Sequence, residues 1–205
     1  MIELYTWGTP NGRKVSIALE ELAMPYNVHS VDIMNGSQFA TGFLALNPNN
    51  KIPVIQDSDG PDGRAVTLFE SGAILVYLAD KAQQLLPEAG IARYHTIQWL
   101  MFQMGGVGPM FGQTHHFRRY AAQEKYSLDR FTAETHRLYG VLNNRLAQSE
   151  FVAGEAYSIA DIAIYPWIAR FELHQIDWGT VPHVKRWYDA VGARPGVRRG
   201  MKVLA

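Results

Sequence analysis

The sequence predicts an α/β domain followed by an all-helical domain. Up to about residue 84, strand-like and helix-like segments alternate every ten to fifteen positions or so, which is typical of α/β units. Later segments show only the apolar spacing of helices. Between the two parts, Pro87 and Gly90 interrupt the pattern. We therefore expect one domain over residues 1–84 and a second over residues 88–205.

The first domain begins with a short strand and a helix. Apolar residues alternate near the start, and helical spacing follows Thr9-Pro10 until Pro25 ends the run. A short helix is expected before Pro48, and Ser71 opens another helix. The expected strands cover residues 2–6, 26–33, 53–56 and 65–69.

The second domain reads as a helical bundle. A long apolar stripe runs from Leu128 to Leu146 and predicts one long helix. Earlier in the domain, the run Gly105 to Pro109 is expected to bend or break the helix that covers residues 92–104. The expected helices cover residues 92–104, 128–146, 159–173 and 182–193.

Composition excludes several classes of protein. The 205 residues are 47% hydrophobic and 19% charged, which suits a soluble globular chain. Nineteen basic residues balance nineteen acidic ones, so we expect no nucleic-acid partner and no attraction to anionic membranes. No apolar run approaches the length of about 18 residues that spans a bilayer, and no secretory signal is evident, so we expect a cytoplasmic protein.

The chain contains no cysteine. This excludes disulfides, thiolate metal sites and a cysteine nucleophile. Any thiol chemistry must use the thiol of a small molecule.

Two motifs in the helical part have both a structural and a functional interpretation. Ser158 and Asp161 match the pattern of a helix capping box. This structural role explains the Asp161 carboxylate better than a catalytic role does. His115 and His116 suggest a metal site, but adjacent helical residues point about 100° apart. We favour a structural or cleft-lining role for the histidine pair and expect no metal.

Proline at the start of a strand marks a possible binding edge. The Ile52–Pro53 bond in Asn49 to Val54 can be cis, which would turn the Ile52 backbone outward to pair with an extended peptide ligand. An ordinary turn explains the same residues equally well.

Two helix starts could bind a ligand. Ser71 is either a helix cap or, with the helix N-terminus, a carboxylate site, and the adjacent Glu70 could hold an ammonium group. Lys51 with Gln38 would suit a second carboxylate. Thr9 is likewise either a cap or a donor to a thiolate at the end of a strand.

Taken in order, these segments resemble the glutathione transferases over essentially all 205 residues. The resemblance implies a thioredoxin-like first domain and a helical second domain, which together form the glutathione transferase fold. The matching features are Asn50-Lys51-Ile52-Pro53, Phe69-Glu70-Ser71-Gly72-Ala73-Ile74 and the capping box at Ser158.

Within that family the chain looks most like the bacterial Nu class of glutathione-dependent disulfide-bond oxidoreductases. In such enzymes threonine and asparagine at the first helix hold the glutathione thiol, and here these would be Thr9 and Asn11. The segments that resemble this class are Thr9-Pro10-Asn11-Gly12, Gly36 to Phe39, Ser71 to Tyr77, Gln103 to Phe117 and Thr135 to Leu142.

The resemblance also implies roles for further residues. Gln38 and Lys51 would bind the glycyl end of glutathione, the Ile52 backbone before Pro53 the cysteinyl unit, and Glu70 with Ser71 the γ-glutamyl end. Arg130 would reach glutathione from the helical domain. A homodimer is also implied.

The expected activity is disulfide reduction by thiol–disulfide exchange, with glutathione as cosubstrate. One alternative keeps the site but conjugates small electrophiles or reduces organic hydroperoxides. Another is a non-catalytic glutathione-binding regulatory module on the same fold.

Overall fold

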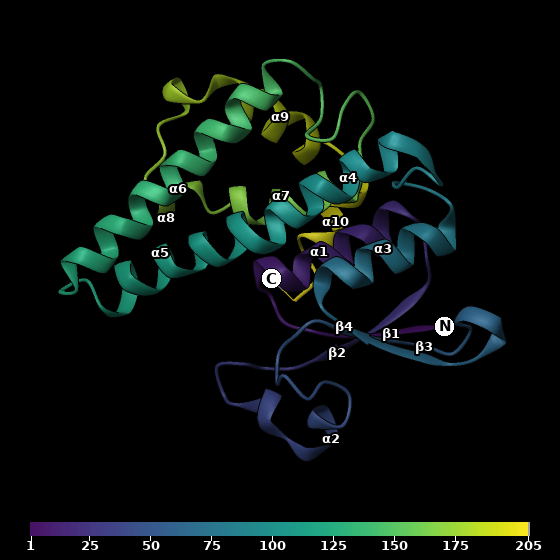
Figure 1. Ribbon diagram of the computed structural model, residues 1–205. Coiled ribbons are helices and arrows are strands. Elements are labelled where there is room, and N and C mark those ends of the chain that lie inside the picture. Colours follow the sequence, from purple (N-terminus) through teal and green to yellow (C-terminus); the bar gives the residue numbers. More distant parts are fainter. Residues whose placement is uncertain (205) are drawn as a thin grey trace. The chain divides into compact units, whose positions relative to one another are not determined.

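The computed structural model describes residues 1–204, which form two compact units (Figure 1). Unit 1 contains residues 1–84 together with the chain from Arg194 onward, and unit 2 spans Leu85–Ala193. The break after Gln84 lies where the sequence predicts a boundary. The C-terminal segment differs from the expectation, because it was assigned to the helical domain and is part of unit 1.

Close backbone packing explains where this segment lies. Helix α10 (Pro195–Gly200) packs on α1 (Pro10–Glu21), and the Ser16 hydroxyl donates to the Gly200 carbonyl at 2.8 Å. A Cβ atom at Gly200 would lie 2.5 Å from Cα of Ile17, so only glycine permits this approach. Such a contact between distant parts of the chain has no local sequence pattern.

Unit 1 contains a four-stranded sheet in the order β2-β1-β3-β4. Strand β1 pairs in parallel with β2 and antiparallel with β3, and β3 is antiparallel to β4. The strand bounds agree with the predicted ones to within a few residues, and β2 is shorter than expected. The strands are β1 (Ile2–Thr6), β2 (Tyr26–Ser30), β3 (Val54–Asp57) and β4 (Val66–Phe69).

Helices α1 and α3 (Ser71–Ala82) lie on one side of this sheet (Figure 1). Their buried apolar residues form the core with Leu4 and Ile55 of the strands. The short α2 (Thr41–Leu44) lies on the other side, after a 3₁₀ turn at Ser37–Phe39. A small cluster of Val31, Phe43 and Val54 attaches this segment to the sheet.

Unit 2 contains helices only, as the sequence predicts. Of the expected bend or break at Gly105 to Pro109, the break does not occur, because a π-helical turn at Gln103–Val107 joins α4 to α5. The wider turn accommodates Pro109 in the first turn of α5, where its missing N–H costs little. The helices are α4 (Gly90–Phe102), α5 (Gly108–Tyr120), α6 (Lys125–Leu146), α7 (Ile159–Ile168), α8 (Phe171–His174) and α9 (Pro182–Gly192).

The capping box at the start of α7 is present. Ser158 caps the helix, and the Asp161 carboxylate accepts from the Ser158 backbone N–H at 3.0 Å. Asp161 also accepts from the Val152 N–H at 3.0 Å and from Trp187 Nε1 at 2.8 Å. It is 0% exposed, so this carboxylate holds the helical unit together and has no access to a substrate.

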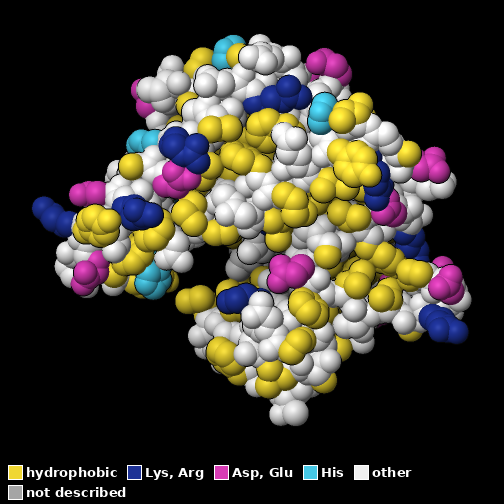
Figure 2. Space-filling model, in the orientation of Figure 1, with side chains coloured by type: hydrophobic (Ala, Val, Ile, Leu, Met, Phe, Trp, Pro, Cys, Tyr) yellow, Lys and Arg dark blue, Asp and Glu magenta, His cyan; other side chains and the backbone are white. Residues whose placement is uncertain are grey.

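On the face shown in Figure 2, acidic and basic side chains are interspersed, in keeping with the zero formal net charge. Within residues 1–204, no helix has the length and hydropathy that a membrane span requires.

Candidate functional site

The strand register of unit 1 brings the predicted site segments to one edge of the sheet. Tyr5 near the end of β1 is paired with Val54 at the start of β3, and Val54 is paired with Phe69 at the end of β4. The connections that follow β1 and β4, and the one that precedes β3, therefore all lie at this edge. These connections contain Thr9, Lys51 to Pro53 and Glu70, and the helix starts that follow β1 and β4 contain Asn11 and Ser71.

At the first helix start, Thr9 is the cap of α1. Its Oγ1 accepts from the Gly12 N–H at 3.2 Å. This oxygen forms no other hydrogen bond with residues 1–204, so the Thr9 hydroxyl still has its own proton to donate. Asn11 lies half-buried in the first turn of the same helix. The cap and the donor interpretations of Thr9 are therefore compatible.

At the second helix start, Ser71 is not the cap. The cap position of α3 is Glu70, whose side chain makes no capping hydrogen bond, and Ser71 is the first helical residue. Glu70 has φ 69° and ψ 110°, a region that non-glycine residues rarely adopt and that costs roughly 1–3 kcal/mol. Such strain occurs often at ligand-binding sites.

Ser71 contacts a residue that the sequence analysis missed. Lys14 on α1 donates from Nζ to Ser71 Oγ at 3.2 Å. Lys14 is 1% exposed, and burial lowers the pKa of its ammonium to about 7, partly opposed by the Glu70 carboxylate. The sequence did contain a signal for this residue, because Lys14 lies on an otherwise apolar face of the predicted helix. A lysine is rarely fully buried unless it has a partner.

The loop before β3 leaves a backbone edge for pairing. The Ile52–Pro53 bond is cis, as predicted. Within residues 1–204, the backbone N–H and C=O of Ile52 make no hydrogen bond. The Ile52 side chain packs against the cluster of Val31, Phe43 and Val54, which fixes the position of this segment.

Two buried acceptors, one in this loop and one in the 3₁₀ turn at Ser37–Phe39, have no partner within the described chain. They are Oε1 of Gln38 and Oδ1 of Asn50. A buried oxygen of this kind needs a donor from a ligand or from water. Lys51, which follows Asn50, is exposed, and its carbonyl accepts from Asn47 Nδ2 at 2.7 Å, which orders the loop.

Arg130 lies in unit 2, on α6. It is exposed and lines a cavity of about 690 Å³ with Met110, Phe131 and Arg137, among others. Glu134, another lining residue, is paired with Arg137 at 2.7 Å.

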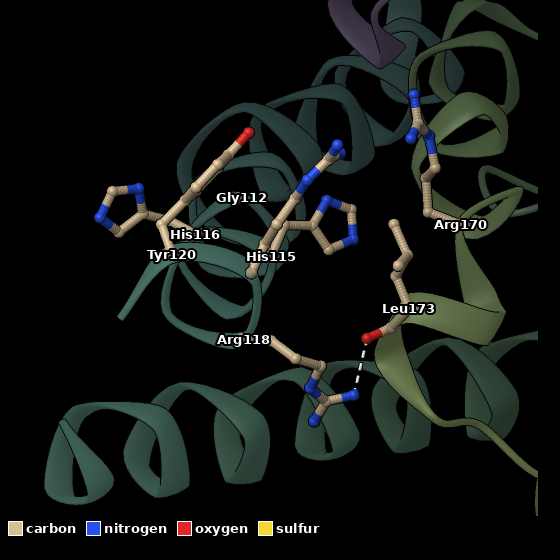
Figure 3. Close-up of a pocket in the computed structure, with 8 residues that line it drawn as sticks. Gly112, His115, His116, Arg118, Tyr120, Arg170 and Leu173 are labelled. Atoms are coloured by element: carbon tan, nitrogen blue, oxygen red, sulfur yellow. Dashed lines mark hydrogen bonds between the residues drawn. The ribbon is translucent and has the colours of Figure 1, made fainter. Parts of the chain in front are cut away.

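The two adjacent histidines of α5 point in different directions (Figure 3). His115 lines a cavity and lies 2.7 Å from His174, measured between the two Nε2 atoms. His116 also lines this cavity, so the expected cleft-lining role is confirmed for both histidines. Among residues 1–204, no group of three or more His, Asp or Glu side chains is arranged to hold a metal.

The edge of unit 1 thus combines two helix N-termini, a hydroxyl donor at each and an open backbone segment. Helix N-termini favour anions, and an open strand edge favours an extended peptide. Two consecutive domain families match this chain. Residues 9–81 match the glutathione S-transferase N-terminal domain, and residues 99–195 match the C-terminal domain.

The chain belongs to the glutathione S-transferase family. Its sequence is 46% identical over 203 residues to the disulfide-bond oxidoreductase YfcG of Escherichia coli, covering 98% of this chain and 94% of that protein. A glutathione S-transferase fold with a thioredoxin-like first unit agrees with the predicted fold class.

Solved structures of the family are similar to this chain over nearly its whole length. A glutathione transferase family member from Pseudomonas fluorescens, with two glutathione molecules bound, has a TM-score of 0.93 and 50% identity, covering 98% of this chain and 92% of that one. A glutathione transferase from Pseudomonas putida, with one glutathione disulfide bound per subunit, has a TM-score of 0.94 and 45% identity, covering 100% and 92%.

Proposed function

We propose that this protein is a glutathione-dependent disulfide-bond reductase of the Nu class. The observation that supports this most directly is the Thr9 hydroxyl, which accepts the cap hydrogen bond and keeps its proton for an acceptor at the sheet edge. A glutathione thiolate is such an acceptor. The absence of cysteine means that the reacting thiol must come from glutathione.

The proposed reaction has two exchange steps. The glutathione thiolate attacks one sulfur of the substrate disulfide, which forms a mixed disulfide and releases the other sulfur as a thiolate. A second glutathione thiolate then attacks the glutathione sulfur of the mixed disulfide. This gives glutathione disulfide and releases the second substrate thiolate. The relatives solved with two glutathiones and with glutathione disulfide match the start and the end of this sequence.

The chain's own residues bind and orient the thiols. Thr9 and Asn11 donate to the thiolate and lower its pKa. The backbone of Ile52 before Pro53 pairs with the cysteinyl unit. The buried, unpartnered oxygens of Gln38 and Asn50 suit donors from the ligand.

The two ends of glutathione carry charge. Lys51 with Gln38 binds the glycyl end, and Ser71 with the α3 N-terminus takes the γ-glutamyl carboxylate. Glu70 holds the ammonium group beside it. Arg130 contributes a further cation from the helical unit.

We further propose that the enzyme acts in the cytoplasm as a homodimer, without metal. The family membership supports the dimer. The lack of cysteine also suits a reducing compartment.

Turnover with three substrate types tests the activity. With saturating glutathione, reduction of a small dialkyl disulfide should exceed both conjugation of an aryl halide and reduction of an organic hydroperoxide by a wide margin. Alkylating the ligand-free enzyme should leave the rate unchanged, since the chain contains no thiol. A dominant aryl halide or hydroperoxide rate would favour the transferase or peroxidase alternative. No turnover with bound glutathione would favour the binding module.

A further inference from the structure

A second cavity, of about 500 Å³, lies entirely within unit 2 (Figure 3). Its walls come from the second half of α5 and from the segment around α8. Basic and apolar residues line it, and none of the lining residues is acidic. The lining residues are Gly112, His115, His116, Arg118, Arg119, Tyr120, Arg170 and Leu173.

Among residues 1–204, the arginines of this cavity have no carboxylate partner. Arg118 donates to the Leu173 carbonyl at 2.6 Å and to Thr132 Oγ1 at 3.2 Å, which fastens α5 to its neighbours. Arg170 makes no side-chain hydrogen bond or ion pair with residues 1–204. Glu172 is near in sequence, but it is exposed and is not among the lining residues. The positive charge around the cavity is therefore not neutralised by its walls.

A buried chain of hydrogen bonds fixes which polar atom His115 presents. The Tyr139 hydroxyl is fully buried and lies 2.8 Å from His174 Nδ1, and His174 Nε2 lies 2.7 Å from His115 Nε2. Tyr139 has no other hydrogen-bond partner in residues 1–204, so its proton is donated to His174. His174 then donates from Nε2, and His115 accepts.

It follows that the neutral His115 carries its proton on Nδ1. Burial, together with Arg170 and Arg118, lowers the pKa of His115 to about 4, so the ring is neutral at physiological pH. In Figure 3 the ring points toward Arg170 and Leu173, whereas His116 points away from them. The cavity therefore offers the His115 N–H donor and guanidinium groups, and the His115 nitrogen that could accept is already occupied.

We propose that this cavity binds the carboxylate of an apolar or aromatic organic acid. Arg170 would pair with the carboxylate, and His115 Nδ1–H would donate a second hydrogen bond to it. Leu173 and the Tyr120 ring supply apolar wall for the body of the ligand. The volume is large for an inorganic anion alone and within the range of small-molecule sites. This site shares no residue with the glutathione-binding edge proposed for unit 1.

Calorimetric titration of the full chain, without glutathione, tests the proposal. The probes are 2-naphthoate, its neutral analogue 2-naphthamide, and inorganic phosphate. Naphthoate should bind to the wild type, while the amide and phosphate should bind at least about tenfold more weakly. Arg170→Gln should weaken naphthoate binding by about tenfold or more. Arg64→Gln removes the same charge from an exposed position in unit 1 and should leave it unchanged.

Equal binding of naphthoate and naphthamide would show that the cavity does not recognise the carboxylate and would overturn the proposal. Phosphate binding as tight as that of naphthoate would overturn the assignment of an organic ligand. Equal loss in the Arg170 and Arg64 variants would show a nonspecific charge effect. As a second readout, ¹⁵N NMR of the imidazoles should find His115 protonated on Nδ1 and His174 on Nε2. In Tyr139→Phe this preference should be lost, with naphthoate binding weakened several-fold. An Nε2-protonated His115 in the wild type would contradict the proposal.

Discussion

Lys14 and Ser71, 57 positions apart in the sequence, are joined by a buried hydrogen bond of 3.2 Å between Nζ and Oγ. The bond links α1 to the start of α3. Because Ser71 accepts from Lys14, its own hydroxyl proton is directed to a different acceptor. Lys14 thus positions Ser71 and, below its pKa of about 7, places a cation behind the site proposed for the γ-glutamyl carboxylate.

Replacing Lys14 with Met should weaken glutathione binding by about tenfold. The change removes one charge-assisted hydrogen bond, typically worth about 1.5–3 kcal/mol, and keeps the side-chain volume. Titration calorimetry measures the effect, with exposed Lys202→Met as the matched control. Equal affinity in both variants would mean that Lys14 only fills the core.

Lys14 should also make stability depend on pH. Burial lowers its pKa to about 7 in the folded chain, whereas an unfolded lysine titrates near 10.4. Above pH 7 the unfolded chain therefore binds the extra proton, so the free energy of unfolding should rise with pH, by at most about 1.4 kcal/mol per unit.

Urea unfolding of the wild type and of Lys14→Met at pH 7, 8 and 9 measures this contribution. The free energy of unfolding should increase more steeply with pH in the wild type than in Lys14→Met. The gain that the wild type shows at pH 9 should be lost as the pH falls toward 7. Parallel pH profiles would show that Lys14 keeps its ordinary pKa.

Ser71→Ala should weaken glutathione binding by about 1–3 kcal/mol, since a carboxylate would lose a hydrogen bond. Ser71 is 4% exposed and is not the side-chain cap of α3, so the helix should remain intact. Calorimetry gives the affinity, and circular dichroism checks the fold. Unchanged affinity in a folded variant would remove Ser71 from the site.

Asn11→Ala should slow disulfide turnover by roughly tenfold while affecting glutathione affinity less. A donor that stabilises developing thiolate charge matters more in the transition state than in the ground state. Thr9→Ala should behave similarly, whereas Thr9→Ser keeps both the cap and the hydroxyl and serves as the control.

The double variant Thr9→Ala, Asn11→Ala should show less than the additive loss if both donors serve one sulfur. Steady-state rates at saturating glutathione decide this. A double variant as fast as the wild type would leave both residues as structural elements of the helix start.

Asp161→Asn should destabilise the chain by about 2–4 kcal/mol. The new amide group would face N–H donors that the carboxylate accepts from, including Val152 N–H and Trp187 Nε1. Exposed Asp129→Asn is the control and should change stability by less than about 0.5 kcal/mol. Denaturant unfolding measures both, and a small effect at Asp161 would contradict the structural role.

Local signals in the sequence predicted most of the elements. Apolar spacing after Thr9-Pro10 predicted α1, and the Ser158–Asp161 pair predicted the start of α7. These features depend on residues within a few positions of one another, and so they can be read without the tertiary structure. The family resemblance then added Asn11 and Arg130 to the candidate site residues and assigned each residue its role toward glutathione.

Long-range packing decided what local patterns could not. The positive φ of Glu70, the π-helical turn before Gly108 and the packing of α10 on α1 each depend on partners far away in the sequence.

By itself, the sequence determined an α/β unit followed by helices, a chain without cysteine that needs an external thiol, and candidate donors at two helix starts. Only the tertiary structure placed Lys14 behind Ser71 and joined Tyr139, His174 and His115 into one buried chain. The physical reason is that a buried polar group is stable only beside its partner, and which partner it meets depends on how distant helices pack.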